Sequence, residues 1–144
     1  IKPFDNIHCY LNIPDTSNRD SLFQAEARRC KDIIDVIDSD KTKTHFCIFD
    51  ELYSGTNPED AVESADSFIK YLCKRPVTFM LTTHYIDLCH KLKPIKNIRN
   101  SCMKIIEEND NIKYTYKYKK GICSTKGGKQ VLKDLGYPDE IFYT

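Results

Sequence analysis

The stretch His45-Phe-Cys-Ile-Phe-Asp50-Glu51-Leu-Tyr-Ser54-Gly55-Thr56 carries more information about this chain than any other part of it. A short apolar run ends there in two adjacent carboxylates. A second apolar run, Val77-Thr-Phe-Met-Leu-Thr82, leads to His84. Two buried parallel strands would bring the ends of both runs to one edge of a sheet, where α/β proteins bind their ligands. We therefore predict an α/β protein with its functional site at this edge.

The polar residues at the two strand ends suit the hydrolysis of a nucleotide. Asp50 is placed to hold Mg²⁺, usually through its water shell, and Glu51 to orient or deprotonate the attacking water. His84, after the next strand, can sense or stabilise the terminal phosphate. Each residue also has a simpler interpretation: Asp50 and Glu51 as surface acids, and His84 as a packed histidine. Asp-Glu after an apolar run is a weak signal by itself.

Length and composition are typical of a globular domain. The chain has 144 residues, which is enough for one domain with a core. Its net charge of +1 gives no indication that the whole surface attracts nucleic acid or membranes. No apolar run approaches the ~20 residues that a membrane-spanning helix needs. The start, Ile1-Lys-Pro-Phe4, is neither an initiator methionine nor a signal peptide, so we expect the chain to begin inside a longer protein.

The seven cysteines have wide spacing and no C-x-x-C pair, and several lie in apolar runs. This is typical of reduced core cysteines in an intracellular protein, in the cytoplasm or nucleus. Cys89 and His90 are adjacent and would point to different faces of a helix, which argues against a zinc site with His84. Abundant Lys, Ile, Asn and Tyr suggest an AT-rich genome, as in some protists or large DNA viruses, so a viral origin is considered.

The rest of the pattern predicts strands and helices in alternation, followed by an antiparallel pair. Ser21 with Gln24 has the form of a capping box, and Asn57-Pro58 that of an N-cap and first helical residue. No interdomain linker is visible, so we expect no separate second domain. Strands are predicted at 5–13, 45–49, 77–82, 101–107 and 112–119, and helices at about 20–38, 57–73, 86–92 and 127–135, with another beginning at Pro138.

Lysine and tyrosine alternate along the predicted strand 112–119. A lysine face on a terminal strand favours protection of a sheet edge over a contact with DNA.

Four elements, in order along the chain, resemble motifs in the C-terminal half of the ATPase domain of MutS-type DNA mismatch repair proteins, a branch of the ABC ATPases. Ser21-Leu-Phe-Gln-Ala-Glu26 is similar to the family's Ser-Thr-Phe-x-x-Glu signature. Phe49 to Thr56 resembles the Walker B and D-loop pattern Asp-Glu-x-Gly-Arg-Gly-Thr, and Thr83-His84-Tyr85 resembles the Thr-His-Tyr switch. Gly121-Ile-Cys-Ser124 and Leu135-Gly-Tyr-Pro138 resemble the closing elements.

The resemblance implies a P-loop NTPase core with a mostly parallel sheet, flanking helices and an antiparallel pair near the C-terminus. It implies ATP and Mg²⁺ at composite sites between two paired ATPase domains, in a homodimer or heterodimer. One subunit would supply Asp50 for the metal and Glu51 and His84 for catalysis. The other would supply Ser21, Gly55 and Thr56. DNA with mispaired or distorted bases would bind to domains absent here, and ATP would switch the protein between clamp states.

The sequence also departs from the family pattern. Ser54 replaces a common arginine, Leu22 a threonine and Asn57-Pro58 the usual Ser-Thr, and Tyr10 stands where an arginine often follows the early strand. These departures affect details of subunit communication.

The phosphate loop G-x-x-x-x-G-K-[ST] is absent from the sequence, and the nearest match, Gly127-Gly128-Lys129-Gln130, is interpreted as the start of a helix. The family places this loop and the first strand upstream of the motifs found here. We therefore expect them before residue 1, and we expect this chain alone to be inactive as an ATPase.

Three alternatives stay open. An ABC ATPase of the chromosome-maintenance or Rad50 type would carry a Leu-Ser-Gly-Gly signature and long heptad arms, and the sequence has neither. A nucleotide-dependent binding module without hydrolysis is disfavoured by Glu51. A structural fragment with no activity of its own is the third. The DNA feature that the longer protein would recognise, a mismatch, a recombination junction or another distortion, is also open.

Overall fold

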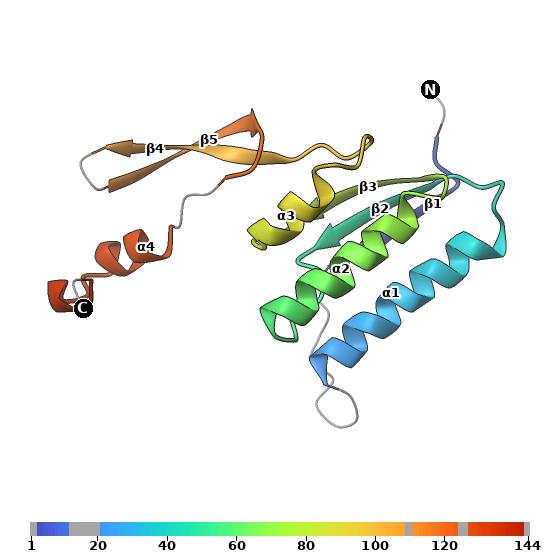
Figure 1. Cartoon of the computed structure of the whole chain (residues 1–144), viewed down its shortest axis with the longest axis horizontal. Coiled ribbons are helices and arrows are strands. Elements are labelled where there is room, and N and C mark those ends of the chain that lie inside the picture. The colour runs from blue at the N-terminus through green and yellow to red at the C-terminus, as the bar shows by residue number, and fades with distance from the viewer. Residues whose placement is uncertain (1–2, 12–20, 109–110, 124–126, 143–144) are drawn as a thin grey trace. The chain divides into compact units, whose positions relative to one another are not determined.

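The computed structural model describes residues 3–11, 21–108, 111–123 and 127–142 (Figure 1). The chain divides into two compact units, Ile1–Asn97 and Ile98–Thr144. The prediction that the chain is one portion of an ATPase domain, without a separate second domain, stays a prediction.

The first unit is built on a parallel sheet of three strands in the order β1-β2-β3. These are β1 (Asn6–Tyr10), β2 (His45–Asp50) and β3 (Val77–Thr82). Asp50 is the register partner of Thr82 at the carboxyl end of the sheet. The two apolar runs are therefore neighbouring parallel strands that end at the same edge, as the sequence predicted.

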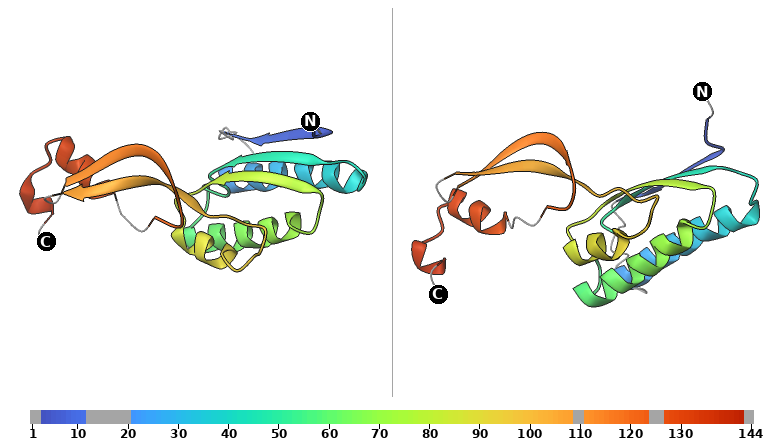
Figure 2. Two further views of the ribbon diagram at one scale, coloured as in Figure 1. Left: turned by 90° about the horizontal axis from the view of Figure 1, so that it is seen from above. Right: turned by 45° about the horizontal axis from the view of Figure 1, so that its top comes forward.

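Three helices alternate with these strands: α1 (Leu22–Ser39), α2 (Pro58–Leu72) and α3 (Ile86–Leu92). Figures 1 and 2 both show α1 and α2 on the same side of the sheet. Parallel neighbouring strands require a crossover connection of about a dozen residues or more, usually through a helix. The predicted α/β class with a parallel sheet and flanking helices is confirmed. Each predicted element in this unit is present, but β1 ends at Tyr10, and positions 12 and 13 of the predicted strand lie outside the described residues.

The core lies between these helices and one face of the sheet. Cys47 and Phe49 of β2 are fully buried, and Phe49 meets Phe68 of α2 edge-on, with 5.4 Å between ring centroids. Ile33 and Ile37, one helical turn apart on α1, are each 1% exposed. The period of 3.6 residues in the helix and of two in the strands thus places one apolar face of each element in the same core.

The prediction that β3 is a buried strand is wrong for the described unit. Its residues alternate between half-buried and exposed, and Met80 is 64% exposed. Within the described unit, β3 lies at one end of the strand order, and α1 and α2 cover only one face of the sheet. A continuous apolar run predicts burial on both faces of a strand, but periodicity cannot distinguish a covered face from an uncovered one.

Both predicted helix starts are confirmed. The Ser21 side chain accepts a hydrogen bond from Gln24 N at 3.3 Å, and the Gln24 side chain accepts one from Ser21 N at 2.9 Å, which completes the capping box. Asn57 caps α2 by accepting from Asp60 N at 3.0 Å, with Pro58 as the first helical residue. The first turn of α2 carries two acidic residues, whereas the first turn of α1 carries none.

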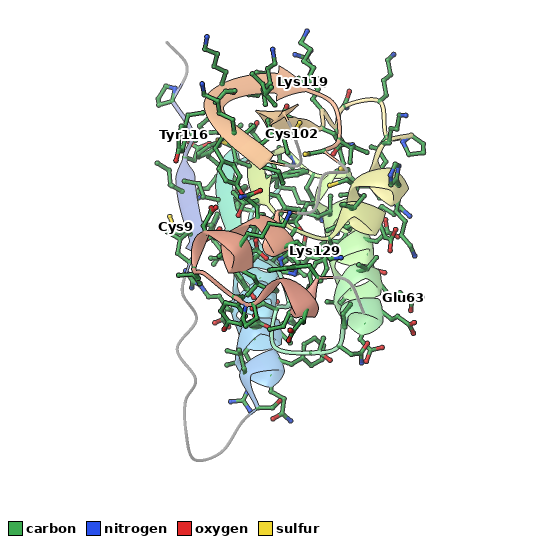
Figure 3. All side chains as sticks on the ribbon, turned by 90° about the vertical axis from the view of Figure 1, so that its left-hand side faces the viewer. Cys9, Glu63, Cys102, Tyr116, Lys119 and Lys129 are labelled. Carbon is green, nitrogen blue, oxygen red and sulfur yellow. The ribbon has the colours of Figure 1, made fainter. Side chains whose placement is uncertain are left out.

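All seven cysteines lie in the described residues, and no disulfide joins them. Cys30 and Cys47 are buried, which confirms the expectation of core cysteines at these two positions. Cys9 is exposed, because it lies on the face of β1 that the helices do not cover (Figure 3). The described residues contain no group of three or more potential metal ligands among His, Cys, Asp and Glu.

The second unit begins with an antiparallel pair, β4 (Ser101–Glu108) and β5 (Asn111–Lys120), with a register shift between Lys104 and Ile105. The pair confirms the predicted hairpin. Lys119 and Tyr116 of β5 are exposed, and Figure 3 labels both. The interpretation of these lysines as edge protection stays a prediction.

A short helix, α4 (Gly128–Asp134), and a single 3-10 turn, η1 (Asp139–Ile141), complete the second unit. Gly127 is the N-cap of α4, so the Gly-Gly-Lys-Gln segment begins a helix as predicted. Gln130 ties this helix to β5, because its side-chain oxygen accepts from Ile112 N at 3.2 Å. No helix within the described ranges is long and apolar enough to cross a membrane.

A pair of histidines is buried between β1 and β2. His8 Nε2 lies 3.0 Å from His45 Nδ1, and His45 is fully buried. His45 Nε2 has no hydrogen-bond partner among the described residues. Burial, and after it the neighbouring His45 and Arg29, lowers the pKa of His8 below its ordinary value of 6.5. The native environment therefore favours the neutral imidazole of His8.

We predict that the free energy of unfolding of the chain falls as the pH drops below about 6.5, because the unfolded chain takes up a proton at His8 that the native state resists. At pH values above the unfolded pKa, this contribution to stability is complete. Urea unfolding at pH 7.5 and 5.5, an interval of ~2 units around the ordinary histidine pKa, measures it. His8→Gln should flatten the pH dependence, whereas His90→Gln, on an exposed residue of α3, should not. An unchanged slope in the His8 variant contradicts the prediction.

Candidate functional site

The carboxyl end of β2 places Asp50 beside a hydroxyl that the sequence analysis did not single out. Thr82, at the end of β3, donates a hydrogen bond from Oγ1 to Asp50 Oδ1. The bond follows from the parallel register, in which Asp50 and Thr82 are direct partners. The two residues lie 32 positions apart, so no local pattern in the sequence indicates this contact. Thr82 thereby orients one carboxylate oxygen and leaves Asp50 exposed to solvent.

Glu51 is held at its backbone by β3 and at its side chain by the loop that follows β3. Its N–H donates to the carbonyl of Thr82 at 3.1 Å, and its carboxylate Oε2 pairs with His84 Nδ1. The φ angle of Glu51 is +55°, in the left-handed region that non-glycine residues rarely adopt. Such local strain is retained where the surroundings enforce it, here by contacts on β3 and His84.

The loop that carries His84, residues 83–85, is stabilised by contacts within itself. Thr83 Oγ1 accepts a hydrogen bond from Tyr85 N at 3.0 Å, and the rings of His84 and Tyr85 lie 4.2 Å apart. Because Nδ1 of His84 faces Glu51, Nε2 is the ring nitrogen left to meet a ligand. The His84 side chain is 63% exposed, so a phosphate oxygen could approach it.

The loop after Glu51 is attached to the core through Tyr53, whose φ is +59°. Its N–H donates to the Tyr10 hydroxyl oxygen at 3.3 Å. Its ring is buried against Phe23 and Phe68, with centroids 5.7 and 6.3 Å away. Burial is the main reason that the pKa of the Tyr10 hydroxyl is raised, so this group stays protonated at every ordinary pH.

A buried carboxylate from α1 holds the next two residues of the loop. Glu26 is 2% exposed, and its Oε1 accepts from Ser54 N at 3.0 Å and from Ser54 Oγ at 2.9 Å. Its Oε2 accepts from Gly55 N at 3.0 Å. A buried carboxylate needs such donors, and the three bonds supply them.

Gly55 lies against the first turn of α1 at a distance that excludes a side chain. A Cβ atom built on Gly55 would lie 2.7 Å from Phe23 N and 2.7 Å from Leu22 Cγ. Because the Phe23 contact is to backbone, it cannot be relieved by rotation of a side chain. The glycine therefore allows the loop to touch the end of α1 that Ser21 caps.

The six predicted site residues all lie around the carboxyl end of the sheet, in two clusters. Asp50, Glu51 and His84 form the first. Ser21, Gly55 and Thr56 form the second: Gly55 lies beside the helix start that Ser21 caps, and Thr56 follows Gly55 in the chain. The loop 52–55 connects the two clusters, and no hydrogen bond joins them directly among the described residues. Ser124, from the closing elements, lies outside the described residues.

The donors of the first cluster fit a magnesium ion. Mg²⁺ in nucleotide sites usually keeps several waters and is bound by one or two carboxylates together with phosphate oxygens. Asp50 offers an exposed carboxylate at a strand end, with one oxygen oriented by Thr82.

Comparison with known protein families agrees with this geometry. The family described as MutS domain V matches residues 1–144 of the sequence. The chain belongs to this family. Its parallel sheet, flanking helices and antiparallel pair are therefore those of a P-loop ATPase fold of the MutS type.

The curated relatives of this MutS domain include proteins with two different names. The DNA mismatch repair protein MutS of Persephonella marina is 29% identical over 84% of this chain, and that of Prochlorococcus marinus is 29% identical over 98%. The endonuclease MutS2 of Clostridium novyi is 26% identical over 92%. The matched region spans only 14%, 15% and 16% of these three relatives' own lengths.

Three residues that depart from the MutS pattern lie in the loop 52–55 or contact it. Tyr53 occupies the position of the first glycine in Asp-Glu-x-Gly-Arg-Gly-Thr, and its positive φ explains why glycine suits that position. Its N–H meets Tyr10, the residue that replaces a common arginine. Ser54, which replaces the other arginine, donates its hydroxyl to Glu26. The substitutions are thus parts of one connected arrangement.

We predict that Gly55→Ala pushes the loop away from α1 and lowers the free energy of unfolding by about 1–3 kcal/mol, because the new methyl group overlaps Phe23 N. Urea denaturation followed by circular dichroism measures the loss. Gly128→Ala is the matched control, because a Cβ there meets no atom within 4 Å, and it should leave stability unchanged or raise it by less than about 1 kcal/mol. Equal stability of the two variants would show that the close approach is not limiting.

Proposed function

We propose that this MutS domain V is the part of a longer DNA mismatch repair protein that hydrolyses ATP with Mg²⁺. The observation that carries the proposal is the pairing of Asp50 with Thr82 and of Glu51 with His84 at one edge of a parallel sheet. Two acids and a histidine at that edge have the chemistry of phosphoanhydride hydrolysis. The relatives named DNA mismatch repair protein MutS support the choice of process.

Each residue of the first cluster has a distinct proposed task. Mg²⁺ would neutralise charge on the β- and γ-phosphates, and Asp50 would hold it through water. Glu51 would orient the attacking water and take its proton. His84 would contact the γ-phosphate through Nε2, while Nδ1 remains on Glu51 and keeps the ring in place.

The cradle for the phosphates has to come from residues other than these. The sequence contains no G-x-x-x-x-G-K-[ST] motif, and the Gly127-Gly128-Lys129 segment begins α4. Backbone N–H groups and the lysine of such a loop bind the β- and γ-phosphates in P-loop enzymes. We therefore assign hydrolysis to the longer protein and not to residues 1–144 alone.

The second cluster suits contact with the ATP of a partner subunit. The first turn of α1 carries no acidic residue, so no carboxylate in that turn competes with an anion for the positive end of this 18-residue helix. Ser21 is exposed at that end, and its hydroxyl hydrogen can still be donated while its oxygen accepts from Gln24 N. Gly55 and Thr56 lie beside it and would complete the cross-subunit surface.

The longer protein would be a homodimer or heterodimer that binds mismatched or distorted DNA through other domains and uses ATP to change between clamp states. A second candidate follows from the relatives named endonuclease MutS2, in which the same ATPase would serve a nuclease. Cleavage of DNA by the purified full-length protein would favour that candidate, and mismatch-dependent stimulation of ATP hydrolysis the first. A binding module without hydrolysis is disfavoured by the Glu51–His84 pair.

We predict that Glu51→Gln in the full-length protein leaves ATP affinity within about threefold and lowers kcat by at least about 100-fold, because only the group acting on water is lost. Asp50→Asn should weaken Mg²⁺-dependent ATP binding as well, since a charge facing the metal is removed. Equilibrium binding and single-turnover hydrolysis measure both quantities. Glu63→Gln, on the exposed face of α2, is the control. Indistinguishable Asp50 and Glu51 variants would refute this division of roles.

We predict that Ser21 acts across the dimer. In mixed full-length dimers, one subunit carries Ser21→Ala and the other Glu51→Gln. If Ser21 serves the partner's ATP, both lesions fall in one composite site and the other site keeps working, so about half of the activity remains. If Ser21 only caps its own helix, the lesions fall in different sites and hydrolysis is lost. Folded, dimeric protein without residual ATPase activity would exclude the cross-subunit role.

A further inference from the structure

The Glu26 carboxylate stands out among buried charged groups of the described residues, because three hydrogen bonds from one short loop converge on it. The donors are Ser54 N, Ser54 Oγ and Gly55 N, at 2.9 to 3.0 Å. Two backbone N–H groups in succession and one hydroxyl thus converge on a side chain from a different element. This arrangement fixes the position of the loop relative to α1.

Glu51 depends on a different set of supports. Its N–H bonds to the carbonyl of Thr82 and its carboxylate pairs with His84, so both of these contacts belong to β3 and the loop after it. Neither contact involves Glu26. The first cluster is therefore attached to the sheet, and the second cluster is attached to α1.

Tyr53 lies between these two supports and separates them. Its ring is anchored in the core and its N–H bonds to Tyr10, so the backbone is fixed at the residue before Ser54. A displacement of Ser54 and Gly55 would therefore reach Glu51 only through an anchored residue. Gly55 touches the backbone of Phe23 and has no room to move toward α1, and Glu26 prevents it from moving away.

We propose that Glu26 is a positioning residue that holds the Ser54–Gly55 loop and the Ser21 helix start as one rigid surface for the partner subunit's ATP. This inference rests on the proposed function, because it concerns the cross-subunit half of the composite site. Loss of the Glu26 carboxylate would loosen that surface and leave the Glu51–His84 pair of the same subunit intact. The substrate is the ATP already proposed, and Glu26 reaches it only through the loop.

The first test measures the loop directly. Glu26→Gln keeps the size of the side chain but turns one acceptor into an NH₂ group that faces an N–H donor. Hydrogen–deuterium exchange of the full-length protein, followed by mass spectrometry, should then show peptides over 52–57 exchanging at least about tenfold faster, and peptides over 45–50 unchanged. Glu63→Gln makes the same chemical change on an exposed face of α2 and should alter neither region (Figure 3). Unchanged exchange over 52–57 overturns the proposal.

The second test asks which subunit's site depends on Glu26. Glu26→Gln homodimers should lose about tenfold or more in kcat with KM within about threefold, because a misplaced surface affects the reacting geometry more than binding. Mixed dimers of Glu26→Gln with Glu51→Gln should keep the activity of mixed dimers of Glu63→Gln with Glu51→Gln. Homodimers with normal kcat overturn the proposal. Mixed dimers without activity also overturn it, because Glu26 would then act on Glu51 of its own subunit.

A second variant covers the case in which Glu26→Gln does not fold. A second pairing of subunits separates a failure of the Glu26 proposal from a failure of the cross-subunit model. If Glu26→Gln does not yield folded dimers, Glu26→Asp keeps the charge, falls about one carbon–carbon bond short of the loop and should give the same pattern. If mixed dimers of Ser21→Ala with Glu51→Gln are also inactive, the cross-subunit arrangement itself is wrong, and this inference falls with it. If those dimers are active but the Glu26 pairing is not, the proposed function stands and only the role of Glu26 is refuted.

Discussion

The parallel register of β2 with β3 is the constraint on which the site depends. It makes Asp50 and Thr82 direct partners, and it places the carbonyl of Thr82 where Glu51 N can bond to it. In a parallel pair, the chain leaves both strands at the same edge, so the residues that follow them meet without any further arrangement. The Asp50–Thr82 bond and the Glu51–His84 pair both follow from this geometry.

A second support comes from α1. The helix begins at a capping box and presents Glu26 about one turn inside, where it is buried against the loop that follows Glu51. A buried carboxylate is costly unless its oxygens have donors, and the loop provides three of them. The same bonds that satisfy Glu26 therefore determine where Ser54 and Gly55 lie. The two halves of a composite site can in this way be held rigid by different elements of one subunit.

The residues that differ from the MutS pattern show how a loop can keep its path with a changed sequence. Tyr53 adopts a left-handed φ that glycine would adopt without strain, a cost on the order of 1 kcal/mol. Its ring is buried against Phe23 and Phe68, and burial of an aromatic side chain stabilises the fold by about 1.5–3 kcal/mol. The packing is large enough to offset the strain, so a tyrosine can hold a position at which the backbone favours glycine.

The sequence by itself determined the elements and their order, because strand and helix periodicity, the Ser21–Gln24 and Asn57–Pro58 starts and the motif order are local signals. It also indicated Asp50, Glu51 and His84 as one cluster. The tertiary structure alone decided that Thr82 bonds to Asp50, that Glu26 is buried beneath the loop and that one face of β3 is exposed in the described unit. The first two features depend on contacts between residues 32 and 28 positions apart in the sequence, and the third depends on which elements cover the sheet. No local sequence pattern encodes either kind of information.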